Sequence, residues 1–157
     1  MQTVDGLDGL EKLFVGIQLA YDENVRPKVE ELLESQMDEL EKDHKRYFDK
    51  SESSAGNKWA KLAPATIARK GHDTILIDTG QLVRSLTQRG SNYSIREFFR
   101  GSEGTGLLFG TGVPYATFHM TGTSRMPARP EVGLTPDRIE DFETKLGDIV
   151  VEQILTG

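Results

Sequence analysis

The sequence predicts an α+β fold with long N-terminal helices, a small antiparallel sheet with short helices, and a C-terminal amphipathic helix. Three observations predict this class. Apolar residues recur at helical spacing over the first fifty residues, two short apolar segments flank a glycine-rich stretch near the middle, and a second helical pattern closes the sequence. We expect one structural unit, with an N-terminal helical part at 1–50 and an α+β body at 51–157.

The N-terminal part is expected to form two helices, at about 5–23 and 26–49. Pro27 suits the first turn of the second helix. That helix would be about 36 Å long, whereas a compact chain of this size has a radius of gyration of about 15 Å. We therefore expect the second helix to project from the body or to pack against another copy. The apolar residues on which both helices rest are Leu10, Leu13, Phe14, Ile17 and Tyr21, then Val29, Leu32, Leu33, Met37, Leu40, Tyr47 and Phe48.

The body begins after the polar loop at 51–57. Trp59 and Leu62 are expected to lie under the sheet and to anchor the chain as it leaves the helices. Residues 78–80 can cap a short helix. Beyond it, strands near 94–98 and 106–110 are expected to form a hairpin across 100–104.

The last third of the chain is expected to contain two more helices joined by an arm. A short helix at 114–120 ends at Gly122, and an extended arm with two prolines follows it. Residues 135–137 then open an amphipathic helix that continues to Ile154.

Composition limits the class of protein. The chain has 157 residues, of which 36% are hydrophobic and 28% charged, so it should fold. It has no cysteine, which excludes disulfides, thiolate metal sites and a cysteine nucleophile. No apolar run is long enough to cross a membrane and residues 1–5 lack the features of a signal peptide, so we expect a soluble protein that is not exported.

Charge is divided into blocks along the chain. The net charge is -7 over residues 1–55, +6 over 56–130 and -5 over 131–157. A basic middle between two acidic ends makes charge-matched association plausible, including contact between copies of the chain.

The sequence gives little evidence for catalytic residues. The glycines between 101 and 112 lack the order of a nucleotide-binding loop, and no serine stands in the turn of a hydrolase. The three histidines are far apart, without carboxylates at metal-ligand spacing. We therefore expect no enzyme activity, no cofactor and no metal site, with His119 as a structural histidine bonded to a backbone group.

The basic middle block leaves nucleic-acid binding open as an alternative. Its arginines are interleaved with Tyr93, Phe98 and Phe99, which would suit phosphate contact and base stacking. The acidic net charge of the chain and the lack of a known DNA-binding motif weigh against it.

The order of motifs over about 59–136 resembles the Mu-like phage virion morphogenesis family, whose members are described as tail completion or neck proteins. One departure is Glu131-Val132, where the family tends to continue with a bulky apolar residue after Arg-Pro. The motifs are Trp59-x-x-Leu62, Thr66 and Lys70; Ile75-Leu76, Asp78-Thr79-Gly80-Gln81-Leu82 and Ser85; Gly110-Thr111, Pro114-Tyr115-Ala116 and His119; and Gly122, Met126-Pro127-Ala128-Arg129-Pro130 and Gly133-Leu134.

The resemblance implies a structural virion subunit without catalytic activity. By this resemblance such a subunit would form a sixfold ring at the head–tail junction, assembled in the bacterial cytoplasm. Its partners would be the head–tail connector or adaptor and the tail terminator or tail tube proteins, with genome DNA passing through the lumen. A tail terminator or head-closure adaptor is the alternative in the same setting.

Two groups of residues are candidates for the sites of such a subunit. Two prolines hold the arm extended, so it suits contact with a neighbouring copy, and Arg125 and Arg129 would lie on one face about 13 Å apart. Carboxylates near Glu140 or Asp141 of the next copy are their expected partners. The candidate interface residues are Arg125, Met126, Arg129, Arg96 and Arg100, and the candidate structural anchors are Trp59, Leu62, Tyr115 and His119.

Overall fold

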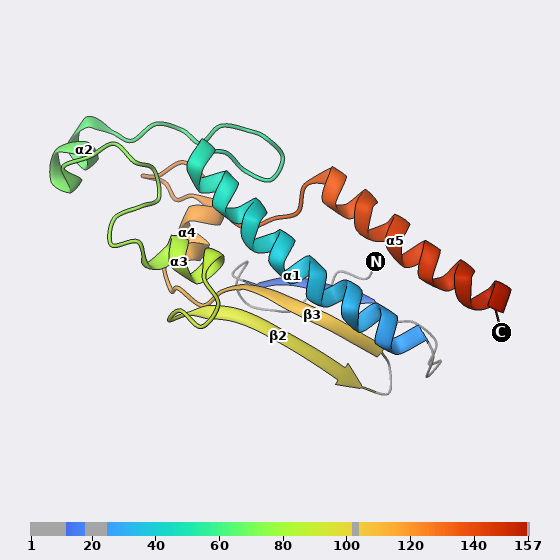
Figure 1. Ribbon diagram of the computed structural model, residues 1–157. Coiled ribbons are helices and arrows are strands. Elements are labelled where there is room, and N and C mark those ends of the chain that lie inside the picture. The colour runs from blue at the N-terminus through green and yellow to red at the C-terminus, as the bar shows by residue number, and fades with distance from the viewer. Residues whose placement is uncertain (1–11, 18–24, 102–103, 157) are drawn as a thin grey trace.

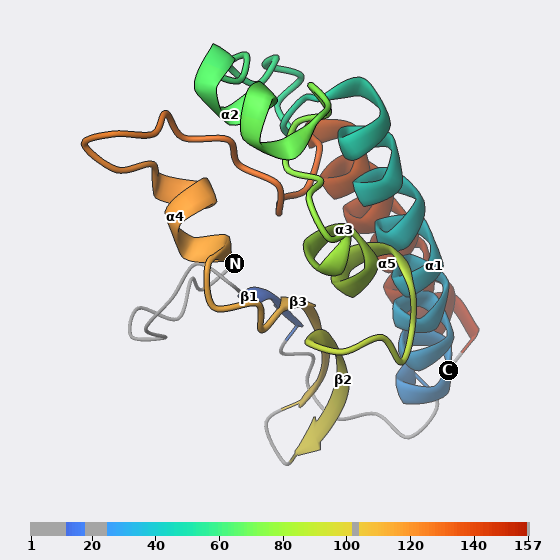
Figure 2. The same cartoon turned by 90° about the vertical axis from the view of Figure 1, so that its left-hand side faces the viewer.

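The computed structural model describes residues 12–17, 25–101 and 104–156. A three-stranded antiparallel sheet of order β1-β3-β2 forms one layer. Helix α1 covers one face of this sheet, and α5 runs antiparallel beside α1 (Figures 1 and 2). The elements are β1 Lys12–Ile17, α1 Val25–Lys50, α2 Pro64–Lys70, α3 Gln81–Thr87, β2 Ser94–Gly101, β3 Gly104–Thr111, α4 Ala116–Thr121 and α5 Pro136–Thr156. The α+β class is confirmed.

The prediction of a helix at 5–23 is wrong where the structure describes it, because residues 12–17 form β1. Every residue of β1 lies opposite a residue of β3. The β-branched Val15 and Ile17 on either side of Gly16 favour a strand over a helix, and β3 supplies the backbone partners. The rest of the predicted helix lies outside the described residues.

The predicted second helix is confirmed as α1, but it is packed within its own chain. Its apolar stripe, from Val29 through Leu33 and Met37 to Phe48, is buried in a single core shared with α3, β3 and the chain after β3. The expectation that this helix projects or pairs through its stripe with another copy is therefore wrong. The sheet and α5, lying along its length, bury it instead.

The predicted hairpin is confirmed as β2 and β3, and its two faces differ. Leu107 and Phe109 are buried on the face toward α1, where the Phe109 ring lies 4.7 Å from the His44 ring. On the other face, a Cβ at Gly106 would come within 2.1 Å of the Phe99 ring. Glycine at 106 therefore lets the Phe99 ring lie across β3.

The predicted short helices are confirmed as α3 and α4, and each is tied to its surroundings. The Ser85 and Thr111 hydroxyls bond at 2.7 Å, which fixes α3 to the end of β3. Gly122 ends α4 with φ +74, and a Cβ there would lie 2.7 Å from the Ala128 amide nitrogen. A glycine is thus required where the arm folds back on α4. Helix α2 was not predicted; it buries no residue, and it lies at the end of the molecule opposite the end of α5 (Figure 1).

Trp59 is buried, as predicted, but it lies against the end of α1. Its indole nitrogen donates to the Pro130 carbonyl at 3.0 Å, and its ring meets the edge of Phe48 at a centroid distance of 5.5 Å. Leu62 is half-buried against the core. The anchor therefore joins α1 to the end of the arm, instead of lying under the sheet.

We expect Trp59→Ala to lower the free energy of unfolding by about 3–5 kcal/mol, because it removes a buried ring and leaves a cavity. Urea unfolding followed by circular dichroism measures this cost. Trp59→Phe is the matched control, since it keeps a ring against Phe48 and loses only the hydrogen bond to Pro130. Native emission of Trp59 at the wavelength of free tryptophan would contradict its burial.

Candidate interface surfaces

Arg96 and Arg100, two of the predicted interface residues, face α1 of their own chain. The Arg96 guanidinium lies 3.2 Å from the Glu41 carboxylate and 3.8 Å from the Phe109 ring centroid, and its side chain is only 9% exposed. Arg100 meets Glu30 at 2.8 Å and stays largely exposed. Both arginines join β2 to α1. The prediction that Arg96 is an interface residue is therefore wrong, because its side chain is largely buried within the chain. Arg100 is exposed but already pairs with Glu30.

Arg129 is also a structural residue and not an exposed interface residue. It is buried, and its guanidinium donates to the carbonyls of Ala60 at 2.8 Å and Lys61 at 3.1 Å. Its backbone amide donates to the His119 carbonyl at 2.7 Å. Arg129 thus joins the arm to α4 and to the chain after α1.

The tip of the arm is folded, not extended. Thr123 and Met126 exchange both backbone hydrogen bonds, at 2.8 and 3.2 Å, so the chain turns between them. The expected common face of Arg125 and Arg129 is therefore wrong. Arg125 is exposed at the turn and Met126 is half-buried, which leaves Arg125 as the candidate that the structure presents to solvent.

The other predicted anchors, Tyr115 just before α4 and His119 in its last turn, contact each other through their rings. Their ring centroids are 5.7 Å apart in an edge-to-face arrangement, and Tyr115 is exposed while His119 is half-buried. Burial, Arg129 and Lys70 lower the pKa of His119. Its Nδ1 has no partner among the described residues; the backbone bond of His119 is made by its carbonyl.

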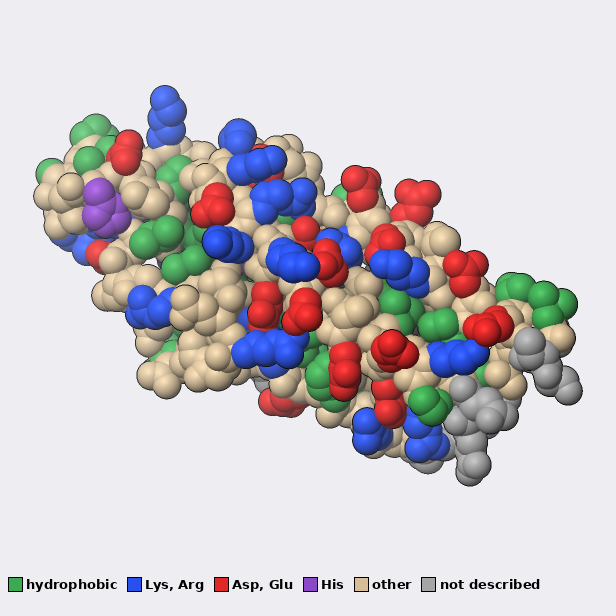
Figure 3. Space-filling view, viewed as in Figure 1, with side chains coloured by type: hydrophobic (Ala, Val, Ile, Leu, Met, Phe, Trp, Pro, Cys, Tyr) green, Lys and Arg blue, Asp and Glu red, His purple; other side chains and the backbone are tan. Residues whose placement is uncertain are grey.

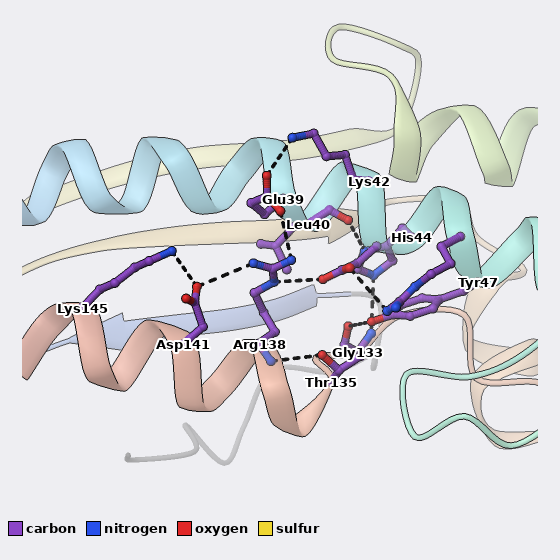
Figure 4. Close-up of polar contacts among 12 residues, drawn as sticks. Glu39, Leu40, Lys42, His44, Tyr47, Gly133, Thr135, Arg138, Asp141 and Lys145 are labelled. Carbon is purple, nitrogen blue, oxygen red and sulfur yellow. Dashed lines mark hydrogen bonds and ion pairs between the residues drawn. The ribbon is translucent and has the colours of Figure 1, made fainter.

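The segment 129–133 is held between α1 and residues 59–61, which follow α1 in the chain. His44 Nδ1 donates to the Leu40 carbonyl at 2.7 Å, and its Nε2 accepts from the Gly133 amide at 3.4 Å (Figure 4). Tyr47 donates to the Gly133 carbonyl at 3.4 Å. Burial lowers the pKa of His44 to about 4 and raises that of Tyr47 to about 12, so both are neutral at pH 7.

Glu131 lies in this segment as a buried carboxyl. Its exposed fraction is 0%, and neither carboxyl oxygen has a hydrogen-bond partner among the described residues. Burial raises the pKa of Glu131 to about 8, so the group is mostly protonated at pH 7. The position at which the resemblance leads one to expect an apolar residue is thus a buried position.

Carboxylates of α1 receive arginines from both flanks. Arg89 contacts Asp38 and Glu41 on the side of β2. On the other side, Arg138 from α5 contacts Asp43 at 2.9 Å and Glu39 at 3.1 Å (Figure 4). Acidic and basic side chains consequently alternate along the face formed by α1 and α5 (Figure 3).

Sequence reasoning missed the roles of His44, Glu131 and Arg138. For His44 the sequence shows only that Leu40 stands four residues before it. Its bond to Gly133 joins residues 89 apart, which a local pattern does not reveal. The departure at Glu131 was noticed, without its burial. Within the described ranges, no three His, Asp or Glu side chains gather to hold a metal, and no helix has the length and apolar character to cross a membrane.

We expect Arg129→Ala to destabilise the fold by about 2–4 kcal/mol, because it removes a buried guanidinium together with its hydrogen bonds to the carbonyls of Ala60 and Lys61. Arg125→Ala should change stability by no more than about 0.5 kcal/mol, since that side chain is exposed. Chemical unfolding of the two variants side by side measures the difference. Equal stability of both would show that Arg129 is not the structural residue described.

We expect Glu131→Gln to stabilise the protein at pH 8.5 and to have little effect at pH 4.5. The folded pKa of Glu131 lies above the unfolded value of 4.5, so the folded state holds the Glu131 proton more tightly than the unfolded state does. The stability that this proton adds to the folded protein is therefore complete at low pH and is lost as pH rises toward 8. At about 1.36 kcal/mol per unit of pKa, the difference at pH 8.5 should be about 3–5 kcal/mol. Urea unfolding at both pH values measures this difference. The titration of His44 also changes stability at low pH, but it does so equally in the wild type and the variant and cancels in the comparison. A difference independent of pH would contradict the burial of an unpaired carboxyl.

Comparison with known proteins gives no relative on which to base a family or a function: no protein-family model, curated protein or solved structure matches the chain.

Proposed function

We propose that the chain is a structural subunit of a tailed-phage virion, a neck or tail completion protein that joins the head connector to the tail. In this proposal it assembles as a homo-oligomeric ring, sixfold by resemblance, between the connector or adaptor and the tail terminator or tube, with DNA in the lumen. It works by holding surfaces together and performs no chemical step.

One observation carries the proposal: residues of the resembling motifs, distant in sequence, contact one another. Trp59 bonds to Pro130, Ser85 to Thr111, and the Arg129 amide to the His119 carbonyl. Gly122 and Gly133 lie where a Cβ would meet Ala128 and Ser54. The motif residues therefore pack together within one body of the structure, and their shared order in the sequence is what supports the proposed role.

The nucleic-acid alternative draws less support. Three arginines of the basic block, Arg89, Arg96 and Arg100, contact carboxylates of α1 within the chain. A guanidinium paired in this way is less available for phosphate.

The proposal predicts that phage particles lacking this protein stop at separate filled heads and tails. Deleting its coding sequence from the encoding phage, with the wild-type chain supplied in trans as control, tests this by electron microscopy and infectivity. Joined, infectious particles without the protein would contradict the proposal. Steeply salt-dependent binding of the purified chain to duplex DNA, together with normal joining, would favour the nucleic-acid alternative.

A further inference from the structure

Two exposed apolar pairs lie at opposite ends of the molecule. Tyr115 and Phe118, at the start and middle of α4, are 38% and 56% exposed. Val151 and Leu155, one turn apart near the end of α5, are 55% and 80% exposed. Helix α4 and the end of α5 lie far apart in both ribbon views (Figures 1 and 2). We call the first surface the α4 patch and the second the α5 patch.

Helix α5 is incompletely packed within its own chain. It extends over 21 residues, yet none of its described side chains is fully buried. Phe142, Leu146 and Ile149 are half-buried against the core. Apolar side chains remain at the surface where α5 ends (Figure 3). Two of these side chains, Val151 and Leu155, form the apolar part of the α5 patch.

The two patches have opposite charge. Residues 58–70 and 112–130, which include α2, α4 and the arm, contain six Lys and Arg and no Asp or Glu; of these six, Arg129 is buried, and Lys58 and Arg69 pair with Glu52 and Asp78. Helix α5 contains six Asp and Glu and two Lys and Arg, of which Arg138 faces α1. Lys61 and Arg125 are exposed at the basic end, Asp148 at the acidic end, and none of the three has an ion pair within the described part of the chain.

We propose that the α4 patch of one copy docks on the α5 patch of the next copy. The occupant of each surface is thus a second copy of this chain: an apolar pair flanked by cations meets an apolar pair flanked by anions. Because the patches differ and lie at opposite ends, the contact is head-to-tail, and repeating it gives a ring or a filament. This inference rests on the proposed function for its biological setting, and it assigns the contact between neighbouring ring subunits.

Engineered cysteines test the contact directly, because the natural chain has none. Phe118→Cys and Leu155→Cys variants, mixed and oxidised, should form a disulfide-linked heterodimer. The control replaces Phe118→Cys by Phe98→Cys, which is 44% exposed on β2 and outside both patches; it should give no heterodimer above background. Cross-linking absent from the first mixture, or equal in both, would overturn the proposal.

Paired disruptions test the polarity of the contact. Phe118→Asp removes the α4 patch and Leu155→Lys removes the α5 patch, and both positions are exposed, so circular dichroism should remain native. Each variant alone should self-associate at least about tenfold more weakly than wild type in sedimentation velocity. A mixture should form one-to-one dimers and nothing larger, since each dimer has lost both free patches. Self-association that Leu155→Lys abolishes and Phe118→Asp leaves intact would show a symmetric contact and overturn the proposal.

The two proposals fail separately. Normal joining of heads to tails by a protein carrying Phe118→Asp would contradict the inferred contact and leave the proposed function standing. If the protein pairs head-to-tail in solution but phage assembly does not need it, the inferred contact stands and the proposed function is contradicted.

Discussion

The packing of one acidic helix against β3, α3 and α5, and its ion pairs with β2, are the constraint on which this structure depends. Helix α1 buries its apolar stripe against the sheet, α3 and the segment 129–133. The same helix carries carboxylates close to the edges of that stripe, where Asp43 is itself buried. A buried carboxylate needs a partner, and Arg138 provides it for Asp43, as Arg96 does for the half-buried Glu41. Apolar packing and charge pairing thus fix the positions of α5 and β2 together.

This arrangement changes the meaning of the charge blocks in the sequence. The acidic first block and basic middle block attract each other, but much of that attraction is satisfied within the chain, between α1 and the arginines of β2 and the loop before it. Fewer charged side chains stay exposed without an ion pair in the described part of the chain, among them Lys61 and Arg125 at one end and Asp148 on α5.

Local patterns in the sequence predicted the elements whose stability depends on local spacing. The periodicity of α1 and α5, the glycine-bounded hairpin and the Gly122 stop of α4 are all of this kind. Strand β1 was missed because six residues cannot separate a period of two from one of 3.6 when a partner strand about ninety residues away decides the outcome. The burial of Arg129 and Glu131 was missed for a related reason: it depends on where Ala60, Trp59 and His44 stand after folding.

The clamp on the segment 129–133 also has a consequence for synthesis of the chain on the ribosome. Helix α1 emerges early, yet Trp59 lacks its acceptor at Pro130, and His44 lacks its donor at Gly133, until more than seventy further residues have been translated. During that interval the end of the stripe around Phe48 stays open to other chains. A nascent chain is therefore most prone to aggregation just before the arm is complete.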